Sequence, residues 1–121
     1  MNTESILDSI KIKCGLVPEE THFDQELIMD INSVFMILNQ LGVGPKEGFS
    51  IHNGEAVWDE YMPEDPIRET VKNYMGMKVK LMFDNSTMSS AVIEVLNRQI
   101  SELEWRLNVA VDPGKEEINA E

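Results

Sequence analysis

Apolar residues recur at helical spacing in the first third of the chain, and two helices are expected there. Residues 4–14 place four apolar side chains on one face, and Gly15 follows where a helix-ending glycine belongs: Ile6, Leu7, Ile10 and Cys14. A longer helix is expected over residues 22–41, with a capping box formed by Thr21 and Asp24. Its apolar stripe is wide and ends before Gly42: Leu27, Ile28, Ile31, Val34, Phe35, Leu38 and Leu41, broadened by Met29, Met36 and Ile37.

Two more long helices are expected in the second half. The first begins at Asp65 and Pro66, which are the preferred residue types for the N-cap and the first helical position. Its buried side consists of Ile67, Val71, Tyr74, Met75, Val79 and Met82. Residues 84–87 break this helix and cap its successor, residues 88–108, whose inward positions are Val92, Val95, Leu96, Ile100, Leu103 and Leu107. The predicted fold is all-α: a bundle of three long helices plus a short N-terminal helix.

Residues 42–66 are an irregular insertion between the second and third helices. An Asn53-Gly54 turn between FSIH and EAVW would suit a small hairpin, whereas AVWDEYM would form one short helix, which is the preferred interpretation. Loops of this length are often functional. Its aromatic residues, Phe49, Trp58 and Tyr61, are therefore candidates for a contact surface.

Composition sets the class of protein. A chain of 121 residues suits one helical domain, here 1–111, followed by a flexible acidic tail at 112–121. A single cysteine favours a reducing, intracellular context, and there is no long apolar run to suggest a membrane span. The net charge of −12 disfavours binding to nucleic acids and anionic membranes. Three interpretations of the acidic charge stay open: it keeps monomers apart, it repels DNA that passes nearby, or it imitates the charge of DNA.

Candidate catalytic and metal-binding residues are few. His22 and His52 lie among polar residues and are expected to be solvated, while Cys14 falls on an apolar stripe and is expected to be buried and inert. The single ExxH pattern, Glu19 to His22, crosses a turn and lacks the second copy that a di-iron bundle requires. We therefore predict no catalytic residue, cofactor or metal site, and no enzymatic activity. Uncharged polar residues in the second helix suit either a plain polar face or an interface: Asn32, Ser33, Asn39 and Gln40.

Several ordered segments carry a family resemblance: INSVFMILNQLGVGPKEGFSI, VWDEYM, VKNYMGMKVKLMFD and QISELEWRLNVAV. Together, over roughly residues 4–111, they resemble the small head–tail connector (adaptor) proteins of long-tailed bacteriophages and prophages of Gram-positive bacteria. Asn85-Ser86 departs from the family, where a proline-rich link is expected.

The resemblance implies an all-α virion subunit at the head–tail junction, present in the host cytoplasm during assembly. Its partners would be the portal protein above and a head-completion or tail protein below. About twelve copies would form a ring that extends the DNA channel without binding DNA specifically, and the subunit can be monomeric in isolation. The rival hypothesis is an acidic DNA mimic that inhibits a host nucleic-acid-processing enzyme.

The candidate contact residues include aromatic residues and an arginine, which are enriched at interface hot spots. They are Phe49, Trp58 and Tyr61 in the insertion and Trp105, Arg106, Val109 and Val111 at the end of the last helix. Trp105 fits a core position equally well.

Overall fold

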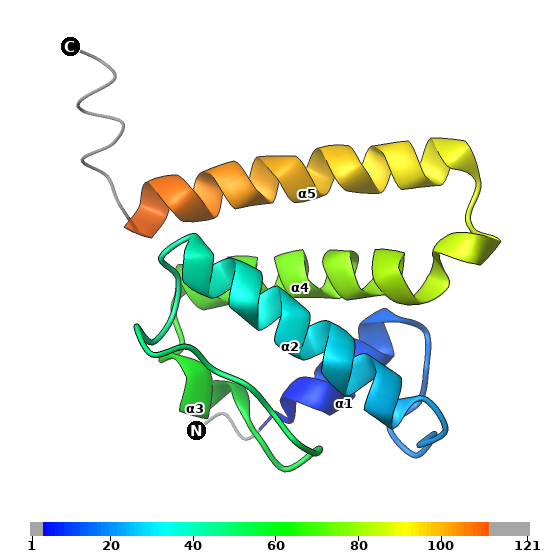
Figure 1. Ribbon diagram of the computed structural model, residues 1–121, viewed down its shortest axis with the longest axis horizontal. Helices are drawn as coiled ribbons and strands as arrows, with labels where there is room; N and C mark the ends of the chain where they lie inside the picture. Colours follow the sequence, from blue (N-terminus) through cyan, green and yellow to red (C-terminus); the bar gives the residue numbers. More distant parts are fainter. Residues whose placement is uncertain (1–3, 112–121) are drawn as a thin grey trace.

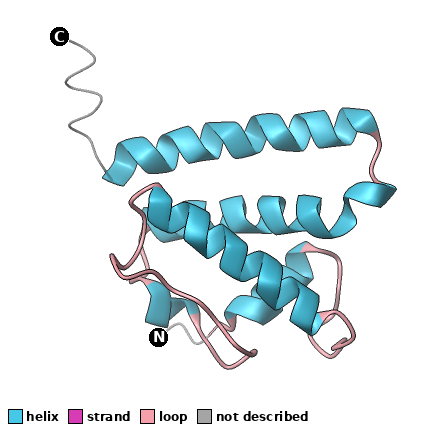
Figure 2. Cartoon of the chain, viewed as in Figure 1, coloured by secondary structure: helices cyan, strands magenta, loops and turns pink. Residues whose placement is uncertain are grey.

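The computed structural model describes residues 4–111, and these form an all-helical unit (Figures 1 and 2). The helices are α1 (Ile6–Lys13), α2 (Asp24–Gln40), α3 (Trp58–Tyr61), α4 (Pro66–Asp84) and α5 (Ser90–Val111), with a 3-10 turn, η1 (Asn85–Thr87), between the last two. The described part of the chain contains no β-strand. The predicted fold class, one short helix and three long ones, is therefore confirmed. The tail predicted at 112–121 lies outside the described residues.

Helix α4 is central to the arrangement. It packs on α1, α2 and α5, and α2 crosses it diagonally, while α5 runs back beside it as the second arm of a helical hairpin (Figure 1). The hairpin bends at η1, where the chain leaves α4. Helix α5 lies at the edge of the molecule and packs mainly on α4.

Side-chain caps define the starts of α1, α4 and α5, and the cap of α4 is as predicted; at α1 the Ser5 hydroxyl accepts the Asp8 N–H. The Asp65 carboxylate accepts the Arg68 N–H at 2.9 Å, and Pro66 occupies the first turn of α4. The start of α2 differs from the prediction, because Thr21 makes no capping bond and the helix begins at Asp24. At α5 the Ser89 hydroxyl accepts the Val92 N–H, so the cap lies after residues 84–87 and not within them.

The core follows the predicted stripes of the first two helices closely. Its buried members on α1 and α2 are Ile6, Leu7, Ile10, Cys14, Leu27, Ile28, Ile31, Val34, Phe35 and Leu38. Leu41 and Ile37 are partly buried against them, whereas Met29 and Met36 are exposed. The stripe on α2 is thus narrower than the run of apolar residues suggests, because the helix rests on its neighbours with one side only.

The hairpin arms are less buried than predicted. Val92, Val95 and Met82 are exposed, although periodicity places them inward, and only Ile100 and Leu107 of α5 are fully buried. The reason is geometric: α4 covers one strip of α5, whereas α1 and α2 pack on α4 and on each other.

Candidate interaction surface

Two asparagines of α2 hold the insertion against the helix. Asn32 forms a reciprocal pair with Ile51, because its Nδ2 donates to the Ile51 carbonyl at 2.9 Å and its Oδ1 accepts the Ile51 N–H at 2.8 Å. Asn39 Nδ2 donates to the carbonyls of Pro45 and Lys46 at 3.1 and 3.2 Å. These two amides therefore bind the loop of their own chain. The two alternatives considered from the sequence, a plain polar face and an interface with another molecule, did not include this role.

The insertion then returns to the N-terminus and ends in a short helix. The Ile6 N–H donates to Ala56 O at 3.0 Å and the Trp58 N–H to Glu4 O at 3.2 Å, with an isolated bridge between Ser5 and Val57. Helix α3 follows directly. The short-helix interpretation is confirmed, and the alternative hairpin does not form in this segment.

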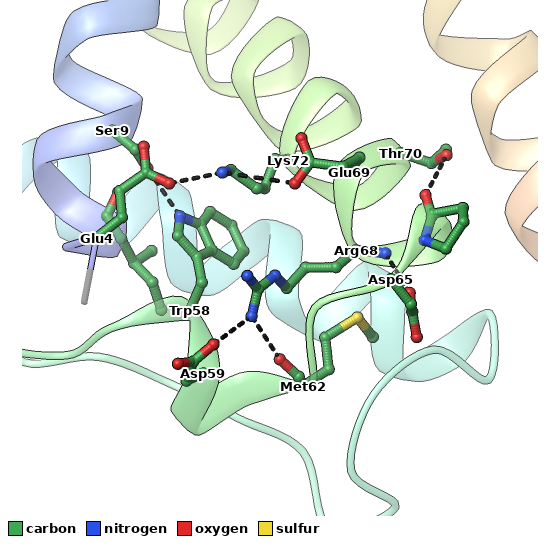
Figure 3. Close-up of polar contacts among 12 residues, drawn as sticks. Glu4, Ser9, Trp58, Asp59, Met62, Asp65, Arg68, Glu69, Thr70 and Lys72 are labelled. Atoms are coloured by element: carbon green, nitrogen blue, oxygen red, sulfur yellow. Dashed lines mark hydrogen bonds and ion pairs between the residues drawn. The ribbon is translucent and has the colours of Figure 1, made fainter. Parts of the chain in front are cut away.

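Trp58 and Tyr61 belong to the core, which corrects the prediction that they present an exposed contact surface. Their side chains are 0% and 4% exposed, and both rings pack against Phe35, with centroid distances of 6.3 and 4.7 Å. Trp58 Nε1 donates to the Ser9 hydroxyl at 2.9 Å, so its polar atom is satisfied inside the fold (Figure 3). One turn of helix carries both rings toward α2, because positions three apart share a face.

A buried arginine that sequence reasoning missed fixes α3 to α4. Arg68 is fully buried, and its Nη1 donates to Asp59 Oδ1 at 2.5 Å and to the Met62 carbonyl at 3.0 Å (Figure 3). The signal was present in its spacing, three residues before Val71 and seven before Met75, on the apolar side of the helix. A charged side chain at such a position is buried only when it has a partner.

Phe49, in contrast, borders an open groove. It is partly buried, with its ring 5.1 Å from that of Phe35, and the groove beside it measures about 540 Å³. The groove is lined by Phe35, Met36, Asn39, Gln40, Glu47, Gly48, Phe49 and Ser50. Met36 is 65% exposed at its edge. A hollow lined by apolar and amide groups, with a single charged side chain, suits an apolar side chain of a partner.

The end of α5 lies next to the start of the insertion. Trp105 is 59% exposed, and Arg106 is exposed and paired with Glu102 at 2.9 Å. Val109 and Val111 are partly buried, and the Asn108 amide donates to Leu41 O at 3.4 Å. Of the four candidate residues here, Trp105 and Arg106 are the most accessible, and Trp105 is not part of the core.

Comparison with known families decides the identity. A family model described as phage connector protein matches residues 6–114. The chain belongs to the phage connector family. No curated protein and no solved structure gives a match. The family resemblance of the sequence segments is thereby confirmed, and the connector is a structural component of the phage particle that associates with portal and tail proteins.

The cysteine and the two histidines considered for catalysis lie where the sequence places them. Burial raises the pKa of the Cys14 thiol to about 11, so the thiol stays protonated at neutral pH. His22 and His52 are both exposed, as predicted. Residues 4–111 contain no group of three or more His, Cys, Asp or Glu side chains placed to hold a metal ion. Nor does any helix in this range have the length and apolar character needed to cross a bilayer.

Proposed function

We propose that this connector assembles as a ring of about twelve subunits below the portal, extends the DNA channel and docks the next tail-side protein. The observation that carries the proposal is the family match over residues 6–114. The role needs rigid faces and no bond chemistry, so we also propose that the chain has no enzymatic activity and no cofactor. Before assembly the subunit would reside in the host cytoplasm.

The charge distribution supports passage of DNA without binding. Phosphates are held by lysine and arginine, and the chain has ten of these against 22 acidic residues. Of the nine that lie within the described residues 4–111, six already pair with carboxylates: Lys11, Arg68, Lys72, Lys78, Arg98 and Arg106. A channel wall built from such subunits would offer DNA few partners.

Two surfaces are proposed to contact neighbours in the particle. One is the groove beside Phe49, and the other is the end of α5 with Trp105, Arg106, Val109 and Val111. Trp58 and Tyr61 are buried, so they are proposed only as support: Tyr61 packs on the Phe49 ring at 5.3 Å, and Trp58 packs on Tyr61. Aromatic residues and arginine at a partly apolar surface are the residue types that dominate interface energies.

Electron microscopy of the connector mixed with its portal tests the proposal. We expect a ring of added density on the tail-side face of the portal, coaxial with its channel. Once such a map identifies the glutamates that face the channel, their replacement by lysine should slow DNA ejection. Failure to bind the portal would overturn the proposal, and so would tight, salt-sensitive binding to a basic nuclease, which the DNA-mimic hypothesis predicts. The family match gives that hypothesis no support.

A further inference from the structure

The face of α5 that points away from α4 carries a regular pattern. Positions spaced alternately four and three residues apart lie along one strip of the helix: Ala91, Val95, Arg98, Glu102, Trp105 and Val109. This strip lies directly opposite Ile100 and Leu107, which face the core. Val95 and Trp105 are exposed, and Arg98 is 72% exposed (Figure 1 shows α5 at the edge of the molecule). Spacing of this kind is the pattern by which two helices pack along a common seam.

The charges on this face alternate in sign. Glu94, Arg98, Glu102 and Arg106 follow one another at intervals of four residues, and two ion pairs form within the helix, Glu94 with Arg98 at 3.5 Å and Glu102 with Arg106 at 2.9 Å. The row contains two acids and two bases, although the whole chain has a net charge of −12. It is therefore a face on which two copies of this acidic protein can meet without net repulsion.

The order of residues is self-complementary about Ile100. An antiparallel second copy centred there brings Arg98 to the level of the partner's Glu102, and Glu94 to the level of the partner's Arg106. The same arrangement sets Val95 beside the partner's Trp105 and Ala91 beside the partner's Val109. A parallel copy in register would instead set like charges opposite each other, which opposes pairing.

We propose that the free subunit pairs with a second copy of itself through this outer face of α5. The contact is antiparallel and two-fold symmetric, and its centre lies at the level of Ile100 along the helix. The inference does not rest on the ring. A two-fold contact uses the same patch on both subunits, so it closes at two and cannot grow. Since it covers Trp105 and Val109, the pair has to separate before those residues can contact anything else.

The contact is small enough for such separation. A helix of 22 residues is about 33 Å long, and a single helix pair of this length buries less than the roughly 1,200 Å² of a standard stable interface. The pair should therefore form at high protein concentration and dissociate on dilution.

Analytical ultracentrifugation of the full chain over a concentration series tests the proposal. The wild type should shift reversibly from monomer to dimer and stop at two. Arg98→Glu and Glu102→Arg should each weaken the dimer by about tenfold or more, because each sets like charges opposite each other twice. Mixing these two variants in equal amounts should restore dimers, because each variant then supplies the charges that the other lacks. Both variants remain strongly acidic, so general attraction between opposite net charges does not explain such a result.

The matched controls are Lys46→Glu and Glu55→Arg, which make the same charge changes at exposed positions in the insertion. They should dimerise like the wild type. Circular dichroism checks that all variants are folded, as expected for exposed side chains paired only within one helix. A wild type that stays monomeric throughout would overturn the proposal. So would a mixture that fails to recover the dimer, or an assembly that grows beyond two, which would indicate a ring contact instead.

Discussion

The ring of Tyr61 occupies the space that any side chain at Gly44 would need. A Cβ atom placed on Gly44 would lie 2.7 Å from both Cε1 and the hydroxyl oxygen of Tyr61, and Gly44 has a φ of +87°. Glycine is required at this position for two reasons: its backbone is left-handed, and the Tyr61 ring occupies the place that a Cβ atom would take. Tyr61 of α3 can therefore pack against the turn after α2 because residue 44 is glycine.

Gly44→Ala should consequently destabilise the protein by about 3 kcal/mol, from backbone strain together with overpacking against Tyr61. Gly15→Ala is the matched control, because Gly15 has a similar φ of +84° but nothing within 4 Å of the added atom. It should lose only about 1 kcal/mol. Urea denaturation measures both, and equal losses would show that the contact with Tyr61 is unimportant.

Asn32→Ala should free the insertion from α2. Both hydrogen bonds to Ile51 are lost, and Ile51 is buried, so we expect a loss of about 2 kcal/mol and faster hydrogen exchange at the Ile51 amide. Gln40→Ala changes an exposed amide on the same helix and should alter stability by less than about 0.5 kcal/mol. Unchanged protection of the Ile51 amide in Asn32→Ala would contradict this account of the loop.

The Asp59–Arg68 pair predicts a rescue. Asp59→Ala leaves the buried guanidinium without its carboxylate and should cost about 2 kcal/mol, less than for a fully buried pair because Asp59 is 41% exposed. Adding Arg68→Met replaces the stranded charge with a shorter, unbranched apolar chain. The double variant should therefore be more stable than Asp59→Ala alone, by about 1 kcal/mol in thermal or chemical denaturation. A double variant less stable than the single one would show that Arg68 stabilises mainly through the Met62 carbonyl.

Cys14 should make stability depend on alkaline pH. Its pKa is raised from 9.0 to about 11 in the folded state, mainly by burial, so the folded protein holds the thiol proton more tightly than the unfolded chain does. The stabilisation is complete below about pH 9 and disappears as the pH rises to about 11. Burial also raises the pKa of Tyr61 and Tyr74, which adds a loss of stability above pH 10.

Cys14→Ala isolates the contribution of the thiol. At neutral pH the free energies of unfolding of the variant and the wild type should differ by a constant amount that reflects packing. Between pH 9 and pH 11 the free energy of unfolding of the variant should fall less steeply. Parallel curves for the two proteins in this range would mean that the thiol has the same pKa in both states.

The groove beside Phe49 can be tested with two methionines of α2. Met36 and Met29 are 65% and 69% exposed, but only Met36 lines the groove. Met36→Glu should reduce incorporation of the connector into particles without loss of stability, because it places a charge where an apolar side chain is proposed to dock. Met29→Glu should be neutral in the same assay. Equal incorporation of both variants would remove the groove from the proposed contacts.

The spacing of apolar residues predicted the helices well, but it predicted less well which helices pack against each other. The stripes of α1 and α2 were correct apart from Met29 and Met36, because each helix packs along much of its length on other helices. Val92 and Val95 were placed inward because a wide apolar stripe suggests several neighbours, and the sequence does not reveal that α5 packs mainly on α4.

The insertion was predictable only in outline. One turn of helix is too short for spacing to distinguish its buried face, so Trp58 and Tyr61 were assigned to a surface. The bonds of Asn32 and Asn39 depend on where the loop runs after it leaves α2, and this is a matter of tertiary structure. The sequence did indicate that Asn32 and Asn39 were unusual, because a solvated helix more often carries Glu or Lys at such positions.

The attachment of α5 through one side also separates two kinds of selection. Residues that face α4 are selected because they stabilise the fold. Residues on the opposite side can be exchanged with little effect on the stability of the subunit. Mutation can thus change what the outer side of α5 binds while the body of the molecule stays the same.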